Sequence, residues 1–110
     1  MTGEPGVSEF VRVGAVDDFE QGLLYDRTVE GKHVAVVRNG ERFFAMLNAC
    51  SHAGYFLTPG RIRDESIDCP GHGAVFRLED GKPTDGPAGD ALELYRVEIE
   101  GTDVMVAPPQ

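Results

Sequence analysis

The sequence has few cysteines and no long apolar run. Cys50 and Cys69 are its only cysteines in 110 residues, which is too few for the disulfide framework of a small secreted scaffold. Nowhere do eighteen apolar residues follow one another, and the opening MTGEPGVSEF has neither the basic start nor the apolar stretch of a signal peptide. We therefore expect a soluble cytoplasmic protein.

Basic residues are also scarce. Ten Lys and Arg stand against nineteen Asp and Glu, which gives a net charge of −9. Binding to a phosphate backbone needs clustered cations, so nucleic acid is not an expected partner. An acidic surface instead steers a protein towards basic partners, at rates that fall as salt rises.

No segment shows the 3.6-residue apolar period of a long amphipathic helix, whereas short β-prone segments recur along the chain. Asn39-Gly40 predicts a hairpin turn, because both residue types tolerate positive φ, and Asp80-Gly81 predicts another turn. Strands are predicted over residues 10–13, 23–29, 33–38, 42–47, 66–68, 75–78, 92–100 and 104–107.

Glycine and proline are unevenly distributed. Residues 49–89 hold seven of the fourteen glycines and four of the seven prolines, so loops should dominate there. The sequence predicts one mostly β domain over residues 1–110, with antiparallel sheets or a β-sandwich as its base. Residues 1–8 should form a loose terminus, and residues 48–89 a loop-rich subdomain.

Both cysteines and two of the three histidines fall into two short motifs. Cys50-Ser51-His52 follows the first predicted hairpin, and Cys69-Pro70-Gly71-His72 begins after sixteen intervening residues. Thiolate and imidazole ligands must meet about 2.0 to 2.3 Å from a metal, so such ligands come from tight turns. The neighbouring glycines allow backbone N–H groups to approach a bound anion or sulfide.

Three other uses of these residues stay open. A Cys₂His₂ set can hold a structural zinc ion, although a one-residue gap within a ligand pair is shorter than is usual in zinc fingers. A disulfide would leave two regularly spaced histidines without a role. A cysteine nucleophile with a histidine base is a third possibility, for which two matched pairs are less natural.

The pattern C-x-H, sixteen residues, C-P-x-H-G and then an aromatic at position 76 resembles the Rieske iron–sulfur family. The flanks VRNGERFFAMLNACSHAG and LYRVEIEGTDVMV are also similar to that family, over residues 10–107. The resemblance implies a Rieske fold whose cluster-binding subdomain spans about residues 48–89. It further implies a Rieske-type [2Fe–2S] cluster, with Cys50 and Cys69 on one iron and His52 and His72 on the other.

Within the family, the chain resembles the low-potential ferredoxins. High-potential respiratory members carry an extra cysteine pair, and a serine and a tyrosine where this chain has Ala74 and Phe76. Hydroxyl donors to sulfur stabilise the reduced cluster, so their absence lowers the reduction potential. The resemblance implies a carrier rather than an enzyme.

The expected carrier is a monomer that passes single electrons from a flavin-dependent reductase to a terminal aromatic-ring-hydroxylating oxygenase. Other contexts are the ferredoxin of a multicomponent monooxygenase, the small subunit of a nitrite reductase and a zinc module. We expect partners to dock on a weakly polar rim around His52 and His72. That rim would be formed by Ala53, Tyr55, Gly71 and Pro87.

Three remaining features are not predicted to belong to the site. His33 opens a predicted strand without partners in a ligand pattern, so we interpret it as a surface or packing residue. The run at residues 17–20, DDFE, is interpreted as a solvated turn. Phe43, Phe44 and Phe76 are core candidates.

Overall fold

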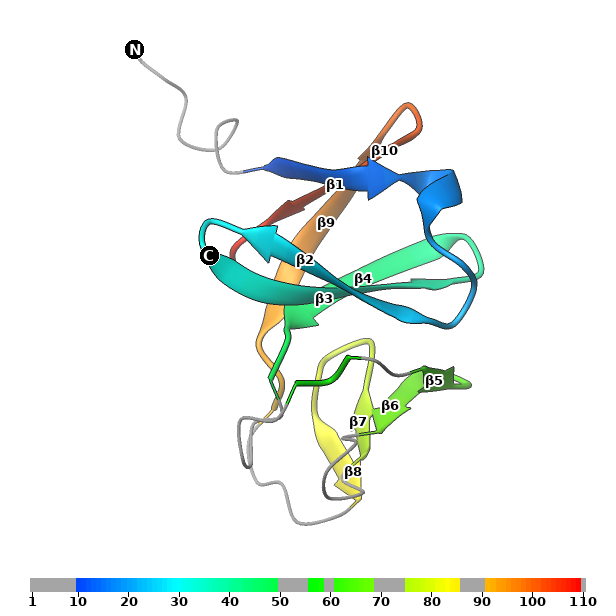
Figure 1. The fold of residues 1–110 in the computed structure, drawn as a ribbon. Helices are drawn as coiled ribbons and strands as arrows, with labels where there is room; N and C mark the ends of the chain where they lie inside the picture. Colours follow the sequence, from blue (N-terminus) through cyan, green and yellow to red (C-terminus); the bar gives the residue numbers. More distant parts are fainter. Residues whose placement is uncertain (1–9, 50–55, 59–60, 69–74, 86–90, 110) are drawn as a thin grey trace.

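The computed structural model describes residues 10–49, 56–58, 61–68, 75–85 and 91–109. This part of the chain forms two antiparallel sheets, one above the other in Figure 1. The larger sheet has the order β1-β10-β9-β4-β3-β2, and its strands are β1 (Val11–Ala15), β2 (Leu24–Val29), β3 (Lys32–Asn39), β4 (Arg42–Leu47), β9 (Leu94–Glu100) and β10 (Asp103–Ala107). The smaller sheet has the order β5-β6-β7-β8, with β5 (Ile62–Arg63), β6 (Ser66–Asp68), β7 (Val75–Arg77) and β8 (Pro83–Asp85).

The mostly β, antiparallel prediction is confirmed. Each predicted strand is present with its ends within two residues of the observed ones, and β5, β8 and the 3-10 turn η1 (Val16–Asp18) are additional. The predicted loose terminus, residues 1–8, lies outside the described residues.

The larger sheet curls until its two edge strands approach each other. Arg27 of β2 donates from Nε to the carbonyl oxygen of Val13 in β1, at 2.9 Å. The curled sheet encloses one apolar core, which includes Val34, Val36 and Val104, all fully buried. The base is therefore one sheet closed around its own core.

Phe19 corrects the prediction that residues 17–20 form a solvated turn. Asp17, Asp18 and Glu20 are exposed, but Phe19 is only 2% exposed. Its ring packs edge-on against Tyr25 and Phe43, with centroids 5.2 and 5.9 Å away. A single apolar residue among acidic ones gives no periodic signal, and tertiary packing decides its position.

The middle of β3 is buried on both faces. Val34 and Val36 face the core of the curled sheet, while Ala35 and Val37 belong to a second apolar cluster. A strand covered on both sides reads as a continuous apolar run rather than an alternating one, which explains the sequence VAVV.

The hairpin between β3 and β4 is confirmed, but its turn lies one residue later than predicted. Asn39 pairs with Arg42 inside the ladder, so the two turn residues are Gly40 and Glu41. Gly40 has a φ of 69°, whereas Asn39 remains in β3. Register in this hairpin thus depends on one positive-φ glycine.

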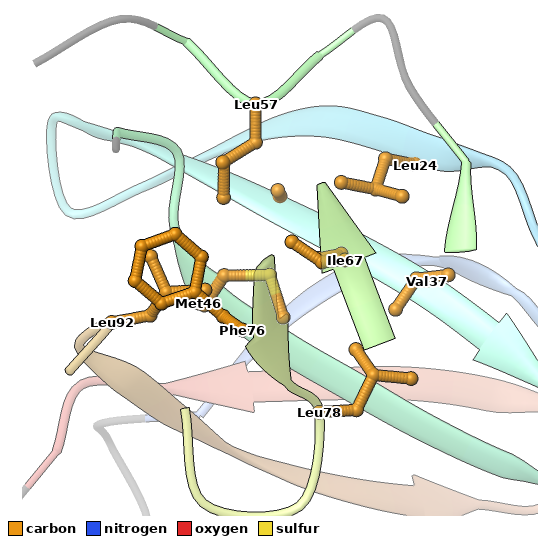
Figure 2. Packing of buried hydrophobic residues seen from close by; sticks show 9 residues of the cluster. Leu24, Val37, Met46, Leu57, Ile67, Phe76, Leu78 and Leu92 are labelled. Carbon is orange, nitrogen blue, oxygen red and sulfur yellow. The ribbon is translucent and has the colours of Figure 1, made fainter. Parts of the chain in front are cut away.

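The second core lies between the two sheets (Figure 2). The larger sheet contributes Met46 and Val37, and the smaller contributes Ile67 and Phe76. Leu94 of β9 packs against this core, whereas Tyr95 packs into the core of the curled sheet. Consecutive residues of β9 therefore serve different cores.

Candidate metal centre

The four predicted ligands, Cys50, His52, Cys69 and His72, lie outside the described residues. So do the predicted rim residues, Ala53, Tyr55, Gly71 and Pro87. Two ligand segments, residues 50–55 and 69–74, contain these four residues. The structure describes the residues that flank each segment on both sides.

The second ligand segment joins two neighbouring strands of the smaller sheet. Asp68, the last residue of β6, pairs with Val75, the first residue of β7. The next pair along the ladder, Ile67 with Phe76, is buried in the core between the sheets. The two residues that flank residues 69–74 are thus held side by side in a β ladder.

The first ligand segment begins directly beyond β4. The N–H of Asn48 donates to the carbonyl oxygen of His33 at 2.9 Å, which extends the β3–β4 ladder to the last residue but one before Cys50. After the segment, Leu57 is fully buried in the core between the sheets. The chain is therefore anchored before residue 50 and after residue 55.

Both ligand segments depend on the same core. Leu57, Ile67 and Phe76 approach one another around Met46 in Figure 2 and belong to one buried cluster. Side chains in a protein interior are packed as densely as molecules in organic crystals, so these three residues have fixed positions. A single core thus supports the chain next to all four predicted ligands.

The buried side-chain amide of Asn48 connects the chain before the first segment with the chain after it. The Oδ1 atom of Asn48 accepts hydrogen bonds from the backbone N–H groups of Leu57 at 2.7 Å and Thr58 at 3.2 Å. Its Nδ2 donates to Asp26 Oδ1 and to Thr58 Oγ1, both at 2.8 Å. Sequence reasoning missed this group, and the only available signal was an asparagine between a strand and the C-x-H motif.

His33 contacts a carboxylate and an aromatic ring. Its Nδ1 lies 3.0 Å from Asp26 Oδ2, and its ring centroid lies 5.0 Å from that of Phe56. Within the described ranges, no group of three or more His, Cys, Asp and Glu residues is arranged to hold a metal ion. The interpretation of His33 as a surface or packing residue agrees with these contacts.

An ion pair borders the turn that closes the smaller sheet. Arg77 donates to both carboxylate oxygens of Asp80, and the N–H of Lys82 donates to Asp80 Oδ1. The hydrogen bond from Arg77, followed by that from Lys82, lowers the pKa of Asp80 from 3.8 to about 2. In the larger sheet, burial raises the pKa of Tyr95.

The donor set fits a Rieske-type cluster. Two thiolates and two neutral imidazoles are the ligands that such a [2Fe–2S] centre takes, and the chain's two cysteines provide no others. The same donors also suit zinc, so the family relationship has to separate the two.

Comparison with known proteins places the chain among Rieske proteins. The model of the Rieske [2Fe-2S] domain matches residues 9–106. The ferredoxin subunit of anthranilate 1,2-dioxygenase from Burkholderia cepacia is 30% identical over 103 residues, which cover 94% of this chain and 95% of the relative.

Solved structures agree with that match. The ferredoxin of carbazole 1,9a-dioxygenase from Nocardioides aromaticivorans IC177 superposes with a TM-score of 0.86 and 36% identity, over 91% of this chain and 98% of the other. A complex of reduced oxygenase and oxidized ferredoxin in carbazole 1,9a-dioxygenase gives a TM-score of 0.83 and 30% identity, over 90% and 93%. A putative NADH-dependent nitrite reductase small subunit from Mycobacterium tuberculosis, with a TM-score of 0.82 over 92% and 96% but 19% identity, shares the fold alone.

The search for long apolar helices in the described residues found none that could cross a membrane. The domain match spans most of the chain, and ferredoxin subunits align with it almost from end to end. The chain therefore belongs to the Rieske [2Fe–2S] domain family, and its cofactor is a Rieske-type [2Fe–2S] cluster.

Proposed function

We propose that this chain is the ferredoxin of an aromatic-ring-hydroxylating dioxygenase system. In this role it carries single electrons from a flavin-dependent reductase to the terminal oxygenase. The observation that carries the proposal is the match with a dioxygenase ferredoxin subunit over 94% of this chain and 95% of the relative. The identity with solved dioxygenase ferredoxins, at 30–36%, exceeds the 19% found for a nitrite reductase small subunit.

We assign Cys50 and Cys69 to one iron, and His52 and His72 to the other. The bound cluster supplies one-electron chemistry. The thiolates hold their iron as anionic ligands, whereas neutral imidazoles leave the centre less negative than four thiolates would. The described residues that flank both ligand segments pack into one core, which supports a fixed position for the cluster.

The reduction potential should lie in the low range of the family. Position 76 holds a phenylalanine that is fully buried in the apolar core, so its side chain offers no hydroxyl to a ligand sulfur. Ala74 likewise carries no hydroxyl. Without these donors the reduced, more negative cluster is less stabilised, and electrons pass on more readily to the oxygenase.

The carrier role also indicates the protein's partners and the compartment in which it works. The oxygenase partner is supported by the solved complex of an oxygenase with a similar ferredoxin. We propose a monomer of one Rieske domain, with residues 48–89 as its cluster-binding part, that performs no substrate chemistry itself. A reducing compartment such as the cytoplasm keeps Cys50 and Cys69 available as ligands.

Reconstitution of electron transfer tests this proposal. Anaerobic protein is mixed with NADH and the flavin-dependent reductase of an aromatic dioxygenase system, and then with that system's oxygenase and substrate. We expect reductase-dependent bleaching of the visible bands and product formation, both abolished in His72→Ala. Asn39→Ala is the control, since it changes a polar side chain at the end of β3 and leaves the assigned ligands intact, and it should retain turnover. Bleaching without product in every dioxygenase system tried would refute the dioxygenase role.

A further inference from the structure

The side chain of Asn48 differs from every other polar side chain that the structure describes. It is 1% exposed, and it is the single polar residue among the buried ones in the described ranges. An asparagine amide has two acceptor positions on oxygen and two N–H donors. All four are used here, by Leu57 N, Thr58 N, Asp26 Oδ1 and Thr58 Oγ1.

These partners fix the orientation of the amide. Backbone N–H groups only donate, so Leu57 and Thr58 require the Asn48 oxygen beside them. An ionised carboxylate only accepts, so Asp26 requires the amide nitrogen. A flipped amide would place donor against donor and acceptor against acceptor, which leaves one arrangement.

The hydrogen bonds connect the chain across the first ligand segment. Asn48 precedes Cys50 by two residues, and Leu57 and Thr58 follow His52 by five and six. Two hydrogen bonds accepted by Oδ1 and one donated by Nδ2 therefore connect the chain before the segment to the chain after it. The fourth bond ties this junction to Asp26 of β2 in the curled sheet.

A second contact holds Asp26 in place. While its Oδ1 accepts from Asn48, its Oδ2 lies 3.0 Å from Nδ1 of His33 on β3. The ring of His33 in turn packs against Phe56, directly after the segment. Asp26, His33 and Phe56 thus form a chain of contacts that ends at the buried amide of Asn48.

We propose that Asn48 is a positioning residue that clamps residues 50–55 and so sets the placement of Cys50 and His52. This inference rests on the ligand assignment proposed above. Asn48 and Leu57 are both buried, so breaking the hydrogen bond between them leaves polar groups that cannot turn to water instead. Without the clamp, the two ends of the segment separate more easily, and the cluster loses one thiolate and one imidazole more often.

The first test compares Asn48→Ala with Asn39→Ala. Asn39 is a matched control, since its side chain also makes two hydrogen bonds, to Gln21 and to the backbone of Asp64, but at the opposite end of β3. The rate of visible-band loss is measured anaerobically with a chelator at 25 °C, with far-UV circular dichroism as a check on folding. We expect at least tenfold faster loss and shifted g values in Asn48→Ala, and a rate within twofold of wild type in Asn39→Ala. Equal rates and unshifted g values in both variants would overturn the clamp.

The second test needs no cavity. Asn48→Asp keeps the shape and the acceptor for Leu57 and Thr58, but at pH 8 it sets a carboxylate against that of Asp26. Adding Asp26→Asn exchanges donor and acceptor and restores the hydrogen bond between the two positions. We expect rapid cluster loss in Asn48→Asp and recovery to within threefold of wild type in the double variant. This comparison also decides the matter if Asn48→Ala does not fold.

Failure of the clamp and failure of the ligand assignment give different results. A double variant that loses its cluster as fast as Asn48→Asp overturns the clamp, while a wild-type mixed-ligand spectrum leaves the assignment intact. A wild-type protein without that spectrum overturns the assignment, and the clamp with it.

Discussion

Gly81 joins the smaller sheet to β9 at a contact that leaves no room for a side chain. Its φ is 73°, and a Cβ there would lie 2.8 Å from the carbonyl oxygen of Leu92 and 3.3 Å from the side chain of Leu94. The N–H of Leu92 donates to the carbonyl oxygen of Gly81 at 2.7 Å, and both residues are buried. Gly81→Ala should therefore separate two backbones that are hydrogen-bonded to each other.

The turn at Gly101 provides the matched control. Its φ is 63°, but a Cβ there meets nothing within 4 Å. An alanine at either position costs roughly 1–2 kcal/mol for the left-handed conformation. At Gly81 the clash also strains the buried hydrogen bond with Leu92, and leaving its groups unpaired costs a further ~1–3 kcal/mol.

Unfolding experiments measure this difference. For 110 residues, an unfolding entropy of about 2.1 cal/mol/K per residue converts 1 kcal/mol into roughly 4 °C of Tm. We expect Gly101→Ala to lower Tm by about 4–9 °C, and Gly81→Ala to lower it by roughly 4–13 °C more. Urea unfolding gives the same comparison in free energy. Equal effects at the two glycines would refute the close backbone crossing at Gly81.

Three further predictions concern charge and potential. The ion pair with Arg77 lowers the folded-state pKa of Asp80 to about 2. Its stabilisation should therefore be present above about pH 4 and disappear as the pH falls towards 2. Asp80→Asn should unfold at a lower urea concentration than wild type at pH 7, with no difference at pH 2. Ala74→Ser with Phe76→Tyr should raise the midpoint potential in a redox titration, and an unchanged potential would contradict the assigned role of these positions. With a net charge of −9, reduction by the reductase should slow about tenfold or more between low salt and 0.5 M NaCl, and rates independent of salt would exclude electrostatic steering.

The strands could be predicted because their signals are local. Short runs of β-prone residues and turn glycines place β4 and β6 at the predicted residues, and they place the other predicted strands within two residues. The turn at Gly40 was predicted one residue early because Asn39 also tolerates positive φ. Which of the two residues bends is decided by the pairing of Asn39 with Arg42.

The missed features depend on contacts between distant parts of the chain. The strands β5 and β8 are only two and three residues long, too short for a periodic pattern, and they form because β6 and β7 offer edges for pairing. Phe19 is buried by rings from two other strands. Ile99 lies within the predicted strand 92–100 but is 44% exposed, beyond the part of the strand that lies between the two cores.

The candidate site also combines features that were predicted from the sequence with features that depend on distant contacts. The four proposed ligands were predicted from the motifs C-x-H and C-P-x-H, because thiolate and imidazole side chains are identified directly from the sequence. The clamp at Asn48 is not, since its partners Asp26 and Leu57 lie 22 and 9 residues away along the chain. A buried asparagine becomes visible only when the fold brings its partners together.

The most direct measurement is the metal content and reduced-state electron paramagnetic resonance spectrum of anaerobically purified protein, with His52→Ala, His72→Ala and Asn39→Ala beside the wild type. We predict a red-brown protein with two irons and two sulfides per chain, and a mixed cysteine–histidine signal that Asn39→Ala keeps and the other two variants lose. A colourless protein with one zinc per chain, or an unchanged signal in His52→Ala and His72→Ala, would contradict the assignment of a Rieske-type cluster to these residues.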